Sequence, residues 1–66
     1  MHEKVNELNK LLGKDVFWIT SDGDGEYSLS NSECMFYGYC NTKNMISFLK
    51  GMIMAIKCDF RKDVFL

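Results

Sequence analysis

The sequence predicts a small α+β domain of two layers, with the element order α-β-β-β-α. Three observations support this prediction. A long segment near the C-terminal end has apolar residues at helical spacing, a shorter N-terminal segment shows the same spacing, and three short runs between them are rich in aromatic and β-branched residues. Turn residues separate these runs, which predicts a three-stranded antiparallel meander with both helices on one face. A chain of 66 residues is expected to form a single domain, 1–66.

The first expected element is a helix, His2–Leu12. Its charged residues face water, while its apolar residues share one face, namely Val5, Leu8, Leu11 and Leu12. Gly13 follows directly and suits the left-handed conformation that ends many helices. The helix is therefore expected to end at Leu12.

Three strands are expected over residues 15–20, 26–30 and 34–40. The first has the aromatic and β-branched enrichment of a strand, and the second alternates between apolar and polar residues. Residues 21–25, SDGDG, contain two Asp-Gly pairs that supply the positive φ of a hairpin turn, and residues 31–33 form a second turn. The acidic turn lacks the ligand spacing of an EF-hand loop, so it predicts an acidic hairpin tip instead.

The best-defined element is a helix over residues 41–58, NTKNMISFLKGMIMAIKC. Its start can be capped by Asn41 or Thr42, and Lys57 suits the negative end of the helix dipole. Six apolar residues at helical spacing predict its buried stripe: Met45, Phe48, Leu49, Met52, Ile53 and Ile56.

The opposite side of this helix carries two further patterns. Ser47, Gly51 and Ala55 form a groove of small residues beside Met54. Three alternatives stay open for it: a close approach by the N-terminal helix, a close approach by a second copy of the chain, or no contact at all. Lys43, Lys50 and Lys57 form a line of basic residues along the helix. This lysine line can bind phosphate or an acidic partner, or it can simply be a solvated face.

Composition argues against several functional classes. The chain is 47% hydrophobic and 14% aromatic, which is too apolar for disorder, and its net charge of −1 gives no general attraction to nucleic acid. No membrane-spanning run or signal-peptide pattern is present, so a cytoplasmic protein is expected. The single histidine, His2, is terminal, and no nucleophile has an evident base. We therefore expect no enzyme, no cofactor and no metal site, and we expect three buried, reduced thiols at Cys34, Cys40 and Cys58.

Strands one and three are apolar on both faces, whereas two helices can cover only one. In strand one, strict alternation places Val16 and Trp18 on one face and Phe17 and Ile19 on the other. In strand three, it places Cys34, Phe36 and Cys40 on one face and Met35, Tyr37 and Tyr39 on the other. Several large side chains should remain uncovered, which usually marks an interface. Four occupants stay open: the tail 59–66, a second copy, a different protein, or nucleic-acid bases. The residues expected to bind a partner are Trp18, Tyr37, Tyr39, Gly51 and Met54.

The segment TKNMISFLKGM, which follows a tyrosine-rich run, resembles the final helix of small accessory proteins of bacteriophages and mobile elements. In these a strand leads through a Thr-Lys start into a helix of the form FLxGM. The resemblance covers about a third of the chain and implies a small inhibitor or adaptor that acts by protein contact. The sequence therefore predicts a non-enzymatic protein-interaction module that self-associates or binds a host protein. The alternative is a small nucleic-acid binder that uses the lysine line.

Overall fold

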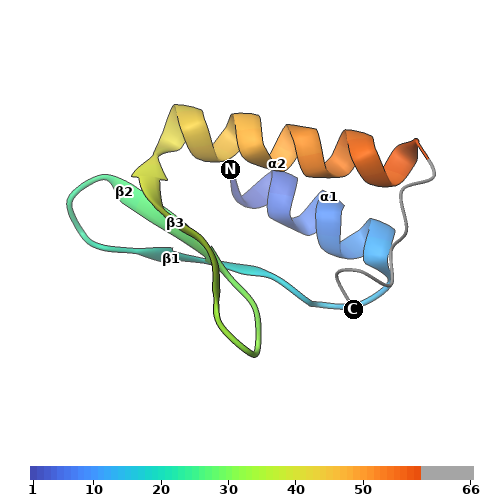
Figure 1. The fold of residues 1–66 in the computed structure, drawn as a ribbon, viewed down its shortest axis with the longest axis horizontal. Helices are drawn as coiled ribbons and strands as arrows, with labels where there is room; N and C mark the ends of the chain where they lie inside the picture. The colour runs from blue at the N-terminus through green and yellow to red at the C-terminus, as the bar shows by residue number, and fades with distance from the viewer. Residues whose placement is uncertain (59–66) are drawn as a thin grey trace.

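The computed structural model describes residues 1–58, in which one helix precedes and one helix follows a three-stranded sheet along the chain (Figure 1). The strands pair antiparallel in the order β1-β2-β3, so the predicted α+β meander with a helix at each end is confirmed. The elements are α1 (His2–Leu12), β1 (Trp18–Ser21), β2 (Glu26–Ser30), β3 (Met35–Asn41) and α2 (Thr42–Lys57). The expectation for residues 59–66 lies outside the described residues.

The two helices lie side by side on the same side of the sheet (Figure 1). α2 packs across β2 and β3, while α1 packs mainly on α2 and touches β1. The two-layer arrangement follows from the apolar stripes, because each helix has one face to bury and the sheet offers one covered face. No helix within residues 1–58 has the length and apolar content needed to cross a bilayer.

α2 supplies half of the core. Five of its six predicted stripe residues are buried, and Phe48 is half-buried at the margin. Each buried aliphatic side chain contributes roughly 1.5–3 kcal/mol, so this face is the largest single source of stability. The buried hydrophobic residues are Val5, Leu8, Leu12, Phe17, Leu29, Met45, Leu49, Met52, Ile53 and Ile56.

Both predicted helix boundaries are confirmed by their caps. Gly13 has a φ of 86° in the left-handed region, and its N–H donates to the carbonyls of Asn9 and Lys10. At the start of α2, the Asn41 side chain accepts a hydrogen bond of 2.8 Å from the Asn44 N–H. Asn41 is also the last residue of β3, so the chain passes from strand to helix without a linker.

The first strand begins three residues later than predicted, at Trp18 instead of residue 15. The physical reason is the side chain of Asn9 in α1. Its Oδ1 accepts hydrogen bonds from the backbone N–H groups of Val16 and Phe17, at 3.1 and 3.0 Å, and its Nδ2 donates to the Phe17 carbonyl at 2.9 Å. Backbone groups that a strand partner would satisfy are therefore satisfied by a helix side chain.

The strand register determines which residues face the helices. Ile19, Leu29 and Tyr37 are aligned across the sheet, and all three contact the core. The next row toward the hairpin contains Tyr27 and Cys40, which also contact the core. From Tyr27 to Leu29 of β2, the paired residues of β3 run from Cys40 to Tyr37, so β3 has one extra residue there. A second extra residue lies between Tyr37 and Met35, which pair with Leu29 and Ser30, so β3 contains two bulges.

Candidate protein-binding surface

Three large apolar side chains are exposed on the sheet face opposite the helices. Trp18 is 47% exposed, Met35 51% and Tyr39 46%. Trp18 precedes Ile19, which faces the helices, so Trp18 faces away from them. Trp18 is paired with Ser30 of β2, and Ser30 is paired with Met35 of β3, so the three residues lie in one row across the sheet. Tyr39 precedes the inward-facing Cys40, and side chains alternate along a strand. These three residues are called the outer patch below.

Ser28 lies on the central strand, next to Leu29, and is fully buried although it alternates toward the same side as the outer patch. Its hydroxyl has no hydrogen-bond partner within the described part of the chain. A buried hydroxyl without a partner destabilises the fold by about 1–3 kcal/mol. The middle of this face therefore contains an unsatisfied polar group flanked by strands that carry exposed aromatic residues.

Tyr37 lies on the opposite face of the sheet from Trp18 and Tyr39, because β3 contains a bulge between Tyr37 and Cys40. It is half-buried and stacks on Phe48, with ring centroids 3.9 Å apart and planes 7° apart. Phe36 also turns toward the helices, at 6.4 Å from Phe48 and 5.2 Å from Phe17. Strict alternation in strand three is therefore wrong, because the bulges allow both Phe36 and Tyr37 to reach Phe48. The structure brings Trp18 and Tyr39 to one face and leaves Tyr37 on the other.

The groove of small residues on α2 is open within residues 1–58. Ser47 and Gly51 are exposed, Ala55 is half-buried, and Met54 is 66% exposed. A Cβ placed on Gly51 would meet no atom within 4 Å. The alternative of a close approach by the N-terminal helix at Gly51 is therefore wrong, because α1 packs against the buried stripe of α2 instead.

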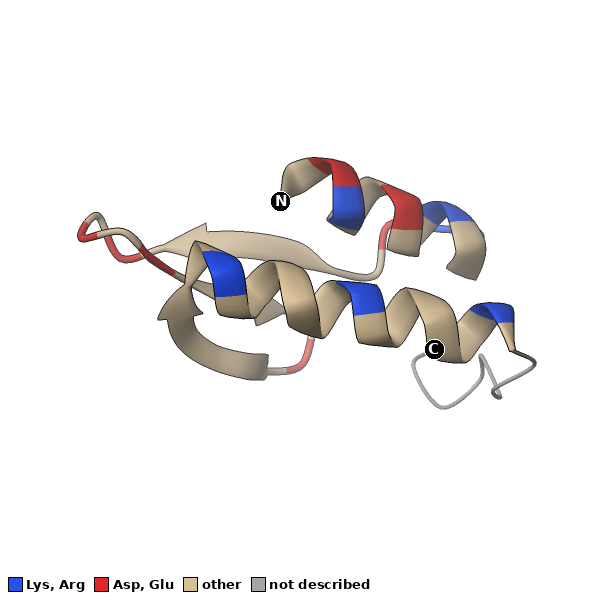
Figure 2. Cartoon of the chain, turned by 90° about the horizontal axis from the view of Figure 1, so that it is seen from above, with Lys and Arg blue, Asp and Glu red and all other residues tan. Residues whose placement is uncertain are grey.

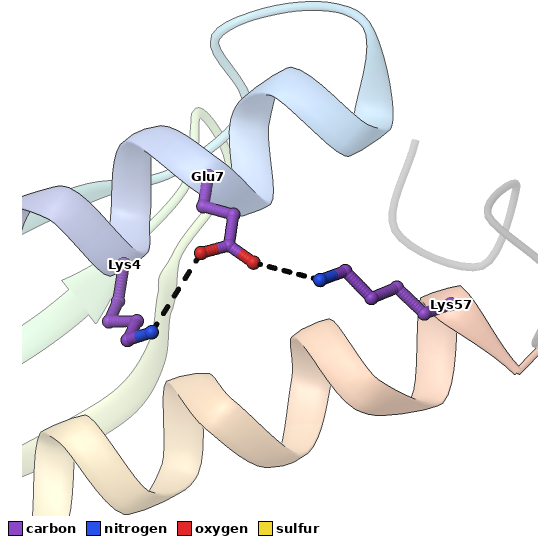
Figure 3. A network of polar contacts seen from close by, with 3 residues as sticks. All are labelled: Lys4, Glu7 and Lys57. Carbon is purple, nitrogen blue, oxygen red and sulfur yellow. Dashed lines mark ion pairs between the residues drawn. The ribbon is translucent and has the colours of Figure 1, made fainter.

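The predicted lysine line runs along the exposed side of α2 (Figure 2). Lys43, Lys50 and Lys57 are all exposed. Lys57 forms an ion pair with Glu7 of α1, with Nζ and Oε2 3.2 Å apart, and Glu7 also pairs with Lys4 at 3.8 Å (Figure 3). Glu7 therefore offsets part of the positive charge of Lys57, because its single negative charge is shared with Lys4.

The cysteines differ from their predicted burial. Cys34 and Cys58 are exposed and Cys40 is half-buried, so the expectation of three buried thiols is wrong. Cys34 precedes β3 and Cys58 follows α2, so neither lies within a helix or strand. Burial, together with the negative charge of Glu26, raises the pKa of the Cys40 thiol above its ordinary value. Cys40 therefore stays protonated at neutral pH and is a poor nucleophile.

The acidic hairpin tip is organised by its own side chains. The Asp22 carboxylate accepts hydrogen bonds from the N–H groups of Asp24 and Glu26, and Gly23 and Gly25 have the positive φ that the turn requires. The predicted hairpin is confirmed. Within residues 1–58, no group of three His, Cys, Asp or Glu side chains is placed to hold a metal ion.

A shallow hollow of about 370 Å³ lies at the end of α1. It is lined by Asn6, Asn9, Lys10, Gly13, Lys14 and Asp15. The Asn9 side chain already makes three hydrogen bonds to the backbone, so it has little left to offer a ligand. The sequence prediction missed Asn9, although a polar residue at helical spacing from Val5 and Leu12 was a usable signal.

Comparison of the chain with protein families, curated proteins and solved structures finds no significant match.

Proposed function

We propose that the chain is a non-enzymatic protein-interaction module that binds a protein partner through the outer patch. The exposure of Trp18, Met35 and Tyr39 carries this proposal. Exposed apolar clusters on small proteins usually mark interaction sites, and Trp and Tyr are enriched among the residues that dominate binding energy. On the helix-facing side of the sheet, Ile19, Tyr27 and Tyr37 pack on the core, and Phe36, although 40% exposed, contacts the rings of Phe17 and Phe48.

The proposal extends to the class of partner. A patch of two aromatic rings and one flexible Met fits a protein surface with an apolar pocket better than a small polar ligand. The resemblance of the α2 segment to small phage and mobile-element proteins supports an inhibitor or adaptor that acts on a host protein in the cytoplasm. Three cysteines, an odd number that includes two exposed thiols, also suit a reducing compartment.

Affinity capture with patch variants tests the proposal. Immobilised wild-type chain, a Trp18→Ala/Tyr39→Ala variant and a Met54→Ala variant are compared, and any captured protein is then purified and titrated against each. The double variant should bind at least about tenfold more weakly, because truncated hot-spot residues each cost more than about 1 kcal/mol. Met54→Ala should bind like wild type, since Met54 lies on the exposed side of α2.

Equal capture by the double variant and wild type would rule out the outer patch as the binding site. Loss of capture with Met54→Ala alone would move the binding site to the groove of small residues on α2. Circular dichroism of each variant should match wild type, because all three substituted residues are at least 46% exposed.

A second candidate function, nucleic-acid binding, is favoured only by the alignment of Lys43 and Lys50 on the exposed side of α2 (Figure 2). Electrostatic binding to phosphates weakens steeply with salt. Fluorescence anisotropy with single- and double-stranded DNA and with RNA at low salt provides the measurement. Binding that disappears in Lys43→Glu/Lys50→Glu would support this candidate over the first, and no binding at low salt would exclude it.

A further inference from the structure

Acidic and basic residues are separated between the two layers of the fold. Residues 15–42, which form the three strands and their turns, contain five acidic residues and no lysine or arginine. The other described residues, 1–14 and 43–58, contain six lysines and two glutamates. Residues 15–42, called the sheet layer below, are therefore strongly negative although the whole chain has a net charge of only −1 (Figure 2).

The acidic residues of the sheet layer are available to a partner. Each of them is exposed, and none forms an ion pair within residues 1–58. They are Asp15, Asp22, Asp24, Glu26 and Glu33. Unpaired charges of one sign on one layer create a negative potential there, which attracts positively charged molecules.

Two of these residues, Glu26 and Glu33, border the outer patch and are called the acidic rim. Glu26 begins β2 and precedes Tyr27, which contacts the core, so Glu26 points to the same side as the outer patch. Glu33 lies beyond the other end of β2, in the turn that leads into β3, two residues before Met35. The outer patch therefore has an acidic residue toward each end of the sheet.

The centre of the same face contains a polar group without a partner. The Ser28 hydroxyl is fully buried on the side of the outer patch and makes no hydrogen bond within residues 1–58. Lysine and arginine side chains carry only donors, and a hydroxyl oxygen accepts from both. A basic partner residue can therefore satisfy Ser28 when the side chains that cover the hydroxyl move aside on binding.

We infer that the outer patch binds a basic surface of a different protein, on which lysine or arginine side chains surround an exposed apolar side chain. This inference rests on the proposed function, because it assigns the chemistry of the partner to the same patch. Apolar contact with Trp18, Met35 and Tyr39 supplies most of the affinity, while the acidic rim speeds association and selects against acidic surfaces. The same charges repel phosphate backbones and anionic membranes.

A second copy of the chain fits this partner less well, although its lysine line is basic. The sheet of one copy would contact α2 of the next, and such a head-to-tail contact produces open filaments unless the rotation closes a ring. The positive charge of Lys57 is also partly offset by Glu7, with the two charged atoms 3.2 Å apart. The inferred partner is therefore a different protein.

Fluorescence of Trp18 tests the inference, because this residue is the single tryptophan of the chain and lies in the outer patch. The probes are three synthetic peptides of equal length. They share the same leucine and phenylalanine residues, contain no tryptophan, and carry lysine, serine or glutamate at every remaining position. The lysine peptide should shift the Trp18 emission and bind at least about threefold more tightly than the serine peptide, since two exposed ion pairs form. The glutamate peptide should bind most weakly, and added salt should reduce the difference.

Variants assign the charge preference to the acidic rim. Glu26→Gln and Glu33→Gln should each weaken binding of the lysine peptide by about twofold to fivefold, the range of an exposed ion pair. Glu26→Lys/Glu33→Lys should abolish the preference for lysine over glutamate, because it makes the rim positive. Tyr39→Ala should weaken the lysine and serine peptides by the same factor. Glu3→Gln is the matched control, since Glu3 is an exposed acidic residue of α1, and it should bind like wild type.

Equal binding of the three peptides, no binding by any of them, or a lysine preference that survives Glu26→Lys/Glu33→Lys would overturn the inference. Self-association of the wild type in sedimentation equilibrium, abolished by Lys43→Glu/Lys50→Glu, would overturn it in favour of a second copy. The two proposals fail separately. Equal binding of all three peptides that Tyr39→Ala weakens removes only the basic partner, whereas a lysine preference that Tyr39→Ala leaves unchanged removes the outer patch as the binding site.

Discussion

A single polar residue, Asn9, connects α1 to the segment that precedes β1. It is buried, and each of its side-chain hydrogen bonds goes to the backbone of Val16 or Phe17. Phe17 itself is buried, so its N–H and C=O have no easy access to water. Asn9 therefore determines where the first strand begins and holds Phe17 in the core.

Asn9→Ala should lower the free energy of unfolding by about 2–4 kcal/mol, because it removes the three hydrogen bonds of the Asn9 side chain to Val16 and Phe17, each of which contributes roughly 0.5–1.5 kcal/mol. Urea denaturation followed by circular dichroism measures the change through the transition midpoint. Asn6→Ala is the matched control, since Asn6 is an exposed residue of the same helix. Equal midpoints for the two variants would show that the Asn9 hydrogen bonds contribute little.

At the scale of the element, the sequence predicted both the bounds and the buried face of α2, whereas for β3 it predicted the strand but not the directions of its side chains. Helical periodicity depends only on local spacing, and it located both the buried stripe and the exposed Met54 correctly. Strand alternation depends on a regular partner. The bulges in β3 break the alternation at Phe36 and near Tyr39, and nothing in the local sequence except Gly38 indicated a bulge.

Met52→Asp should unfold the domain, because it places a charge in the core without a partner. Met54→Asp should shift the unfolding free energy by no more than about 0.5 kcal/mol, as surface substitutions usually do. The two positions share a helix and a residue type, but Met52 is 7% exposed, so burial alone separates them. Thermal melts of both variants provide the comparison, and equal melting temperatures would contradict the assigned orientation of α2.

At the scale of the whole molecule, stability is concentrated in the helical half. The core residues come mainly from α1 and α2, whereas every residue from Thr20 to Glu26 is exposed. The sequence predicted that one sheet face would keep uncovered aromatic residues, and Trp18 and Tyr39 are indeed exposed. It did not predict which face, because both alternations in strands one and three are apolar and only the packing of α2 decides between them.

Amide hydrogen exchange should be slower in the helices than in β1 and the hairpin tip. Amides of Leu49 and Ile53 in α2 should exchange only through global unfolding, while those of Thr20 and Ser21 in β1 should open locally and exchange at least about tenfold faster after correction for intrinsic rates. NMR-detected exchange at native pH measures both sets. Equal protection in β1 and α2 would show that the sheet and the helices open as one cooperative unit.

At Asn41 the chain passes from β3 directly into α2, so no loop separates the strand from the helix. Asn41 ends the strand, and its side chain holds the first turn of the helix. Nothing flexible separates them, so a twist applied to the strand would be transmitted to the helix axis. A change in the direction of β3 would therefore also tilt α2, which carries the exposed lysines and Met54.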